Sequence, residues 1–352
     1  MLRIGIIGLG YWGPNLVRVL SSLPNCEVTA LCDLNTRRVD ELCNRFPSVI
    51  GTTDKSKVLT RDVVDAVVIA TPTKTHYSLA KEALEQGLHT FVEKPLATST
   101  VECKELIELA EQQDLKLFVG HVFLYSAPIA KLKEMVSSGE LGDVCYMSST
   151  RLNLGPVRHD VNALWDLAPH DVSIMLELMG ARPVSVNCSG LAYLNKSVHD
   201  VCTLAMHFEN NRMGIVHVSW LDPHKKREMT IVGSKKMAVY NDIEPLEKIK
   251  VYDNGVEAPS YSDSYGEFQF SYRYGDMYSP RLNEMEPLKA ECLSFVDCIL
   301  QAKRPLTDGQ NGLDVVKVIE AADISLQNGH GEVYLDRLTP QSNGKPRLLV
   351  SS

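Results

Sequence analysis

The sequence predicts a two-domain α/β protein, in which a doubly wound parallel sheet is followed by an α+β domain with an open, mostly antiparallel sheet. Over the first 120 residues, short apolar strands alternate with helical segments, which is typical of a parallel sheet with helices on both faces. After Gly120, strands follow one another with short turns between them, as in an antiparallel meander. The length of 352 residues also exceeds what one ordinary core accommodates.

The first 121 residues are expected to form the first domain. Residues 67–70 read Val-Val-Ile-Ala, an apolar run expected of a strand buried on both faces. Residues 98–113 carry apolar side chains at helical spacing. The expected strands are residues 3–7, 27–33, 49–50, 63–70, 90–93 and 116–120, and the expected helices are residues 13–22, 37–45, 75–86 and 98–113.

Residues 122–352 are expected to form the second domain. Gly139 and Gly180 are plausible C-terminal ends of its first two helices. Residues 253–281, rich in Ser, Tyr and Gly, are expected to be a mobile loop. The expected helices are residues 128–139, 167–179, 284–301 and 312–327, and the expected strands are residues 145–150, 184–191, 202–208, 213–219, 228–232 and 237–240.

Composition argues against several classes of protein. The net charge of −8 disfavours a protein that coats nucleic acid or an anionic membrane. No apolar run approaches the roughly 20 residues that span a bilayer, and the N-terminus leads directly into a strand without a signal-peptide pattern. The nine cysteines are scattered without a C-x-x-C pair, which disfavours a disulfide or metal framework. We therefore expect a cytoplasmic protein without a metal site.

A glycine-rich turn follows the first strand. Gly8, Gly10 and Gly13 form a G-x-G-x-x-G pattern, with Tyr11 and Trp12 inside the turn. Glycines at this spacing allow a tight turn, close approach to a pyrophosphate and packing of the next helix on the sheet. The helix that follows directs its N–H groups and positive dipole end at the phosphates. The pattern predicts a dinucleotide site.

Asp33 stands twenty residues after Gly13, at the end of the second expected strand. A carboxylate there accepts hydrogen bonds from ribose hydroxyls and repels a 2′-phosphate, so NAD is favoured over NADP. Arg37 and Arg38 leave NADP open, since either could reach a phosphate. A turn without any ligand is the remaining alternative.

Two further strand ends carry polar residues. Thr71, Pro72, Thr73 and His76 follow the apolar strand, and we expect them to line the ribose and nicotinamide part of the cofactor, although turn and helix-cap roles are equally open. Glu93-Lys94-Pro95 follows the next strand. Carboxyl ends of parallel strands meet at one edge of a sheet, where such folds bind ligands. Lys94 is therefore a candidate site residue, with a solvated surface lysine as the alternative.

Asp166 and His170 lie four residues apart at the start of an expected helix, so they share one face. Asp166 is expected to be the N-cap of this helix. His170 is expected in the first turn, where the dipole favours the neutral imidazole, a proton acceptor. The alternative is that Asp166 only caps the helix and His170 packs beneath it.

Taken together, these motifs resemble the Gfo/Idh/MocA family, which includes glucose–fructose oxidoreductase and inositol dehydrogenase-like enzymes. The resemblance covers essentially the whole chain. It implies an N-terminal Rossmann domain and a C-terminal domain whose large open sheet forms a homodimer or homotetramer. It also implies that Lys94 orients the reacting hydroxyl, His170 is the general acid/base and Asp166 positions the substrate or the histidine. The expected activity is hydride transfer between a sugar CH–OH carbon and NAD.

Within the family, the segments 10–15 and 220–227 are similar to members from bacterial surface-polysaccharide clusters, which oxidise UDP-hexuronates. Sugar-oxidising relatives usually carry glycine between the Asp and the His, where this chain has Ala168-Pro169. A polar cluster precedes the Asp–His helix, and its cations and amides could bind phosphates or a carboxylate or else form a surface loop. The cluster comprises Arg151, Asn153, Arg158, His159 and Asn162, with Arg151 and Asn153 the expected substrate-binding residues.

Two other functions remain open at this point. The same Lys94, Asp166 and His170 would serve a free-sugar or inositol dehydrogenase, or a ketoreductase that runs the reverse reaction. A regulator that binds the nucleotide without turnover is a third possibility, although such a protein could dispense with Lys94 and His170. Pocket cations distinguish the first two classes, because a diphosphate needs them and inositol does not.

Overall fold

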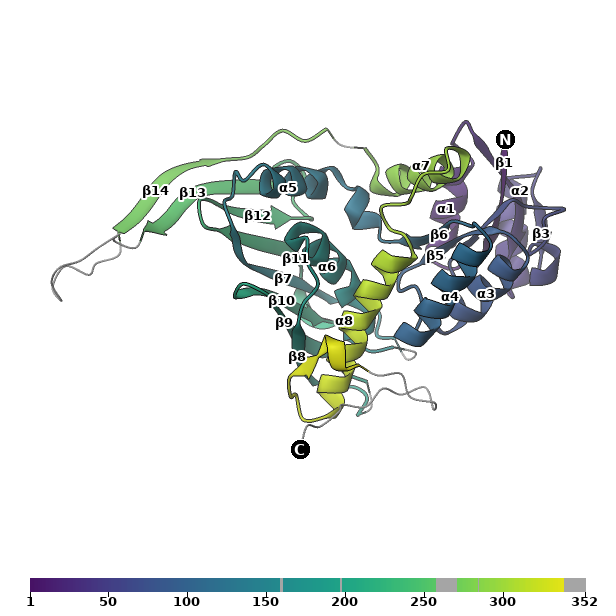
Figure 1. Ribbon diagram of the computed structural model, residues 1–352. Coiled ribbons are helices and arrows are strands. Elements are labelled where there is room, and N and C mark those ends of the chain that lie inside the picture. Colours follow the sequence, from purple (N-terminus) through teal and green to yellow (C-terminus); the bar gives the residue numbers. More distant parts are fainter. Residues whose placement is uncertain (159–160, 197, 258–270, 284, 339–352) are drawn as a thin grey trace. The chain divides into compact units, whose positions relative to one another are not determined.

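A computed structural model describes residues 1–158, 161–196, 198–257, 271–283 and 285–338 (Figure 1). The chain divides into two compact units, and helix α8 (Gly309–Gln327) runs from one into the other. The first unit contains Met1–Ser126 and Met285–Glu320, and the second contains residues 127–283 and 321–338 among those described. The sequence predicted two continuous ranges, 1–121 and 122–352. In the structure, residues 285–320 instead belong with the N-terminal unit.

The first unit is a parallel sheet with strand order β3-β2-β1-β4-β5-β6. All of its paired strands are parallel, and this order is that of the doubly wound dinucleotide-binding fold. The strands are β1 (Leu2–Ile7), β2 (Cys26–Cys32), β3 (Ile50–Thr52), β4 (Ala66–Ile69), β5 (His89–Glu93) and β6 (Leu117–Gly120). The helices are α1 (Gly13–Leu20), α2 (Thr36–Arg45), η1 (Lys55–Lys57), η2 (Thr73–Thr75), α3 (His76–Glu85), α4 (Thr100–Gln112), η3 (Val122–Tyr125) and α7 (Pro287–Leu300).

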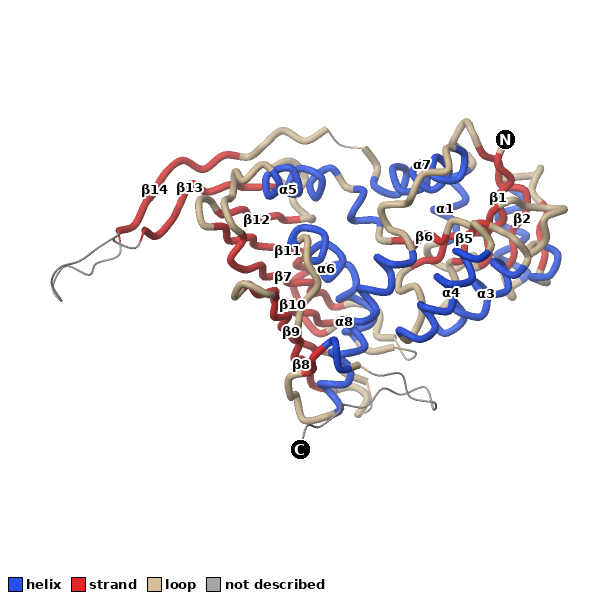
Figure 2. The backbone as a smooth tube through the Cα atoms, viewed as in Figure 1, coloured by secondary structure: helices blue, strands red, loops and turns tan. Residues whose placement is uncertain are grey.

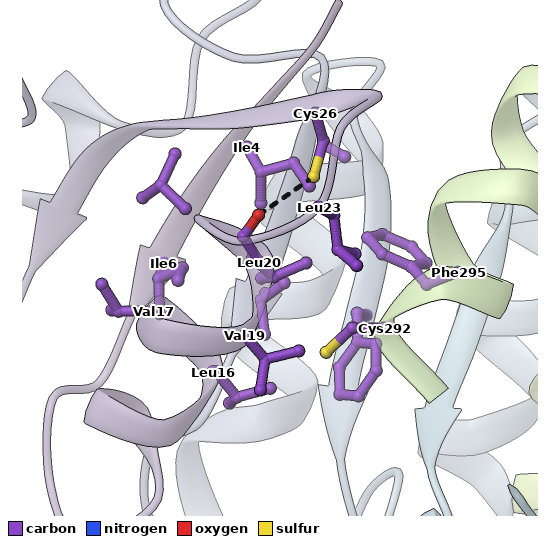
Figure 3. Packing of buried hydrophobic residues seen from close by; sticks show 14 of the residues in the cluster. Ile4, Ile6, Leu16, Val17, Val19, Leu20, Leu23, Cys26, Cys292 and Phe295 are labelled. Atoms are coloured by element: carbon purple, nitrogen blue, oxygen red, sulfur yellow. Dashed lines mark hydrogen bonds between the residues drawn. The ribbon is translucent and has the colours of Figure 1, made fainter. Parts of the chain in front are cut away.

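Helix α7 joins the core of this unit although it lies near the end of the chain. Cys292 and Phe295 are buried in the same apolar cluster as Leu16 and Leu20 of α1, as Figure 3 shows. Phe295 lies with its ring centroid 5.5 Å from that of Phe91, at an edge-to-face angle of 80°. Burial of such side chains stabilises the fold by roughly 1.5–3 kcal/mol each. This packing holds residues 285–320 on the N-terminal unit.

The second unit is an open sheet with strand order β14-β13-β12-β11-β7-β10-β9-β8-β15 (Figure 2). Its pairs are antiparallel except β7 with β10. The strands are β7 (Val144–Leu154), β8 (Ser185–Leu191), β9 (Val201–Phe208), β10 (Arg212–Ser219), β11 (Leu221–Gly233), β12 (Met237–Asn241), β13 (Ile249–Glu257), β14 (Ser271–Tyr278) and β15 (Val333–Tyr334). The helices are α5 (Ala127–Ser137), α6 (Ala163–Met179) and η4 (Leu335–Arg337).

The predicted fold class is confirmed, with a parallel sheet followed by a large, mostly antiparallel one. One prediction is wrong. Residues 253–281 were expected to be a loop, but β13 and β14 pair along much of this segment, and residues 258–270 lie outside the described part. Its Ser, Tyr and Gly composition lacks the apolar alternation of a half-buried strand, because β14 is exposed along nearly its whole length. No helix in the described part is long and apolar enough to cross a membrane.

Candidate functional site

The glycine turn between β1 and α1 provides the first part of the site. Gly8 has a φ of +97°, and a Cβ there would lie 2.5 Å from the carbonyl oxygen of Ala70. A Cβ on Gly13 would overlap the carbonyl oxygen of Gly8. At Gly10, by contrast, the nearest atom to an added Cβ would be Nη1 of Arg38, 4.0 Å away. The space over Gly10 is therefore open, which fits a pyrophosphate seated against this turn.

Asp33 holds the turn in place from the end of β2. Its Oδ2 accepts a hydrogen bond from the backbone N–H of Leu9 at 2.7 Å, and its Oδ1 accepts one from Asn35 N–H at 2.8 Å. Arg38 lies beside it, with Nη1 3.6 Å from Oδ2. A carboxylate offers about four acceptor positions, so Asp33 keeps capacity for ribose hydroxyls. Of the two other predicted turn residues, Tyr11 is exposed and Trp12 is half-buried.

His76 is buried between two strand ends of the first unit. It is 1% exposed, and its Nδ1 and Nε2 lie 2.8 Å and 2.9 Å from the carbonyl oxygens of Pro95 and Thr71. Both ring nitrogens therefore contact protein carbonyls, and the ring links the end of β4 to the turn after β5. Thr73 is also buried, and Pro72 is the N-cap of η2. These contacts support the structural alternative for His76, and its contact with the cofactor stays a prediction.

Glu93 and Lys94 lie at the end of β5, followed by a cis Lys94-Pro95 peptide bond. Gly120 is the partner of Glu93 on β6, and a Cβ at Gly120 would lie 2.9 Å from Oε2 of Glu93. The missing side chain therefore makes room for this carboxyl group. Burial raises the pKa of Glu93 to about 7, although the ammonium of Lys94 and a hydrogen bond from the Trp12 side chain act to lower it.

Two further buried titratable groups lie in this unit. His121 follows β6 and is 1% exposed, and burial lowers its pKa to about 3, with the charge of Lys94 acting in the same direction. Glu291 lies on α7 and is fully buried. A carboxylate on the apolar face of a helix, between Leu288 and Phe295, is the sequence signal that could have identified Glu291.

The second unit carries the Asp–His pair on α6. Helix α6 begins three residues earlier than Asp166, and its N-cap is Asn162, whose Oδ1 accepts from Trp165 N–H at 3.0 Å. The prediction that Asp166 is the N-cap is therefore wrong. His170 lies beyond the first turn, so the predicted effect of the helix dipole on its charge is also wrong, because that effect fades within one turn.

The carboxylate of Asp166 accepts two hydrogen bonds in place of the cap. Nη1 of Arg158 donates to Oδ1 at 3.1 Å, and the indole N–H of Trp220 donates to Oδ2 at 3.1 Å. These contacts fix Asp166 one helical turn before His170, on the same face of α6. The arrangement can orient a histidine and a bound hydroxyl group. His159, another member of the polar cluster, lies outside the described residues.

Arg151 is not placed to bind substrate. Arg151 and Asp171 are each 4% exposed, and Nε and Nη2 of Arg151 donate to the Asp171 carboxylate at 2.6 Å and 3.3 Å. The guanidinium is committed to this buried pair, which joins β7 to α6, so the prediction that it binds substrate phosphates is corrected. Asn153 is half-buried two residues later on β7. Within the described ranges, no group of three or more His, Cys, Asp or Glu side chains is arranged to hold a metal ion.

Comparisons with known proteins identify the family. Residues 2–121 match the model of the oxidoreductase family with an NAD-binding Rossmann fold, and residues 129–239 match the GFO/IDH/MocA C-terminal domain. UDP-N-acetylglucosamine 3-dehydrogenase of Acidithiobacillus ferrooxidans is 29% identical over 67% of this chain and 73% of that protein. The scyllo-inositol 2-dehydrogenase (NAD(+)) of Bacillus subtilis is 25% identical over 93% of this chain and 95% of that protein.

A solved structure of the Acidithiobacillus ferrooxidans enzyme, GnnA, superposes with a TM-score of 0.79 and 25% identity, covering 93% of this chain and 98% of that one. The two family models together match well over half of the sequence. The chain therefore belongs to the Gfo/Idh/MocA family of oxidoreductases, with an NAD-binding Rossmann unit at its N-terminus.

Proposed function

We propose that this protein is an NAD-dependent dehydrogenase that oxidises a CH–OH carbon of a nucleotide sugar such as a UDP-hexuronate. The observation that carries the proposal is the combination of two sets of residues in a family oxidoreductase. Lys94 follows Glu93, whose Oε1 atom is buried, at the carboxyl edge of the Rossmann sheet. Asp166 accepts hydrogen bonds from Arg158 and Trp220 and stands one turn before His170.

In the proposed reaction, His170 accepts the proton of the sugar hydroxyl, and the ammonium of Lys94 stabilises the developing negative charge on the oxygen. Asp166 orients His170 and the substrate. Proton transfer by a positioned side chain contributes about 10²–10⁴ in rate. NAD, when bound, supplies the acceptor for the hydride. The glycine turn at Gly10 would hold its pyrophosphate and Asp33 its ribose.

A nucleotide sugar is favoured over a free sugar by exposed basic residues in the segment that follows Trp220, the residue that contacts Asp166. The register of β11 against β7 shifts between Leu221 and Lys226, so the intervening residues leave the ladder. His224 and Lys225 are exposed there, and the segment follows Trp220 directly. Cations at this position suit a diphosphate. The relative that acts on UDP-N-acetylglucosamine supports this interpretation, and the inositol dehydrogenase supports the alternative.

The decisive experiment is reduction of NAD by the purified protein against UDP-hexuronates, UDP-hexoses, inositols and free hexoses, with mass spectrometry of the products. Lys94→Ala and His170→Ala should each lower kcat by at least about 100-fold, whereas the controls Lys104→Ala and His207→Ala should retain it. Turnover of free polyols alone would replace the nucleotide-sugar proposal with the inositol-type one. NAD binding without any turnover would support a regulator.

The cofactor preference is tested separately. The Asp33 carboxylate disfavours a 2′-phosphate, and Arg38 beside it partly offsets that charge. Asp33→Ala should lower the ratio of kcat/KM for NAD to that for NADP, and Arg38→Ala should raise it. Arg45→Ala, at the other end of α2, is the matched control. An unchanged ratio in Asp33→Ala would contradict the assignment of Asp33 to the ribose.

We also propose a homodimer or homotetramer formed through the C-terminal sheet. The supporting feature is a set of exposed apolar side chains on β14, where Tyr272 and Tyr274 are stacked and Met277 is 56% exposed. Exposed aromatic side chains of this kind are enriched at interfaces between proteins. Light scattering after size-exclusion chromatography, with Tyr274→Lys compared with the parent protein, tests this proposal, which a monomeric parent protein would contradict.

A further inference from the structure

A second buried carboxyl group lies beside Glu93. Glu291 of α7 is 0% exposed, and neither of its carboxyl oxygens has a hydrogen-bond partner among the described residues. Oε1 of Glu93 is buried and likewise without a partner in the described part. Buried polar atoms are nearly always hydrogen-bonded, and a buried charge requires a partner. These three oxygens, on two neighbouring glutamates, therefore favour a state in which the two carboxyl groups share one proton.

The packing of α7 explains why the two acids meet. The Phe295 ring contacts Phe91 and Phe118, with centroids 5.5 Å and 5.4 Å away. Glu93 and Gly120 each lie two residues beyond those phenylalanines on the same face of β5 and β6. Glu291 lies four residues, about one helical turn, before Phe295. Glu291 therefore lies near Glu93, whose charge acts on the Glu291 carboxyl group.

The charges around Glu291 decide which acid is protonated. Burial raises the pKa of Glu291 well above its ordinary range, and the neighbouring Glu93 raises it further. Burial also raises the pKa values of Cys292 on α7 and Tyr125 on η3, so both stay neutral at pH 7. The pKa of His121 is lowered to about 3, so it too is neutral. The charge of Lys94 acts to keep Glu93 ionised. Glu286 at the start of α7 acts on Cys292, and it is ion-paired with Arg18.

We propose that Glu291 is a positioning residue that stays protonated and donates its proton, directly or through one buried water, to the carboxylate of Glu93. Glu93 then carries the single negative charge of the pair and holds the ammonium of Lys94 at the strand end. The expected effect of Glu291 on catalysis rests on the proposed function of Lys94. The protonation state of Glu291 does not rest on that function, because the protonation state depends only on the fold of the cofactor-free protein.

Two substitutions of Glu291 distinguish a role as hydrogen-bond donor from a role in filling space. Glu291→Gln retains a group that donates to Glu93, whereas Glu291→Leu keeps similar volume and cannot donate. Loss of the donor destabilises the Glu93 carboxylate and raises its pKa. Glu291→Leu should therefore move the acidic limb of the pH–rate profile to higher pH and lower kcat about ten-fold at neutral pH. Glu291→Gln should keep the profile of the parent protein.

The matched control is Glu320→Leu. Glu320 is another buried glutamate of the same unit, and its Oε2 accepts a hydrogen bond from Thr100 N–H at 3.3 Å. It should lower stability without moving the pH–rate profile. A purely structural role for Glu291 would make Glu291→Leu behave like this control, which would overturn the proposal.

Two measurements on the cofactor-free protein need no turnover. Infrared spectroscopy at pH 9, well above the pKa of about 7 of Glu93, should detect a protonated carboxyl group in the parent and in Glu320→Leu, but not in Glu291→Gln. NMR of ¹³Cε-labelled lysine, with Lys94 assigned from Lys94→Arg, should show a changed Lys94 titration in Glu291→Leu and an unchanged one in Glu291→Gln. If the parent protein oxidises no sugar but both measurements give the expected results, the proposed function is contradicted and the inference about Glu291 is not. Failure of either measurement would overturn this inference.

Discussion

The indole N–H of Trp220 donates to the carboxylate of Asp166 across 3.1 Å, although 54 residues separate the two in sequence. Trp220 lies between β10 and β11 and is 1% exposed. The contact anchors the first turn of α6 to the sheet of the second unit. It holds one carboxylate oxygen of Asp166 in a fixed direction. Without this contact, the Asp166 side chain could adopt several rotamers.

Trp220→Phe should therefore lower catalysis as well as stability. The change removes one hydrogen bond to a charged group, worth about 1.5–3 kcal/mol, so kcat should fall by roughly ten-fold or more. Steady-state kinetics and thermal unfolding of the same preparation give the two effects. A lower melting temperature with unchanged kcat would show that the indole only fills space.

The glycine turn offers a matched pair of substitutions. Gly13→Ala should destabilise the fold by roughly 1–3 kcal/mol, because its Cβ overlaps the Gly8 carbonyl oxygen. Gly10→Ala meets only Arg38 Nη1 at 4.0 Å, so its stability should change by less than about 0.5 kcal/mol. Its added methyl group occupies the space proposed for the pyrophosphate. Calorimetry should show about ten-fold weaker NAD binding by Gly10→Ala, and parent-like affinity would argue against this cradle.

Removing one partner of the buried Arg151–Asp171 pair should strongly destabilise the second unit. Arg151→Met leaves a buried carboxylate without this partner and should cost about 3–5 kcal/mol. The double variant Arg151→Met/Asp171→Leu should recover most of that loss, because it removes both charges. The control Lys55→Ala breaks a largely exposed pair with Glu82 and should cost less than about 1 kcal/mol. Equal losses in the single and double Arg151 variants, measured by urea unfolding, would contradict this account.

His89 should make stability depend on pH in the acidic range. Burial lowers the pKa of His89, and the positive charge of Lys116 acts in the same direction. Its Nδ1 accepts a hydrogen bond from Lys116 N–H at 3.0 Å. Below the ordinary value of about 6.5, the unfolded chain binds a proton that the folded ring resists. The free energy of unfolding should then fall as the pH drops from about 6.5 towards the lower pKa of the folded state.

His89→Asn retains an acceptor but does not titrate. Its unfolding free energy, measured by urea titration at several pH values, should fall less steeply than that of the parent protein between about pH 7 and pH 5. Parallel curves for the two proteins would show that His89 is as readily protonated in the folded state as in the unfolded one.

Local patterns in the sequence determined the elements and much of the cofactor turn. The alternation of strands and helices fixed the parallel sheet, because each apolar segment shows its period within a few residues. The glycines at 8, 10 and 13 and the acid at 33 could be assigned in the same way, since the chemistry of that turn depends on neighbours along the chain. Asp166 and His170 share a helix face by spacing alone.

Contacts between distant segments decided the rest. Arg151 was identified as a polar residue near the site, but only folding brings it against Asp171 and removes it from substrate. β14 is exposed along most of its length, and it is held by pairing with β13 and not by an apolar core. Glu291 belongs to a helix near the end of the chain, and its position beside Glu93 arises from Phe295 packing on Phe91. A sequence specifies such groups, but their burial and therefore their charge depend on partners that only the tertiary structure brings together.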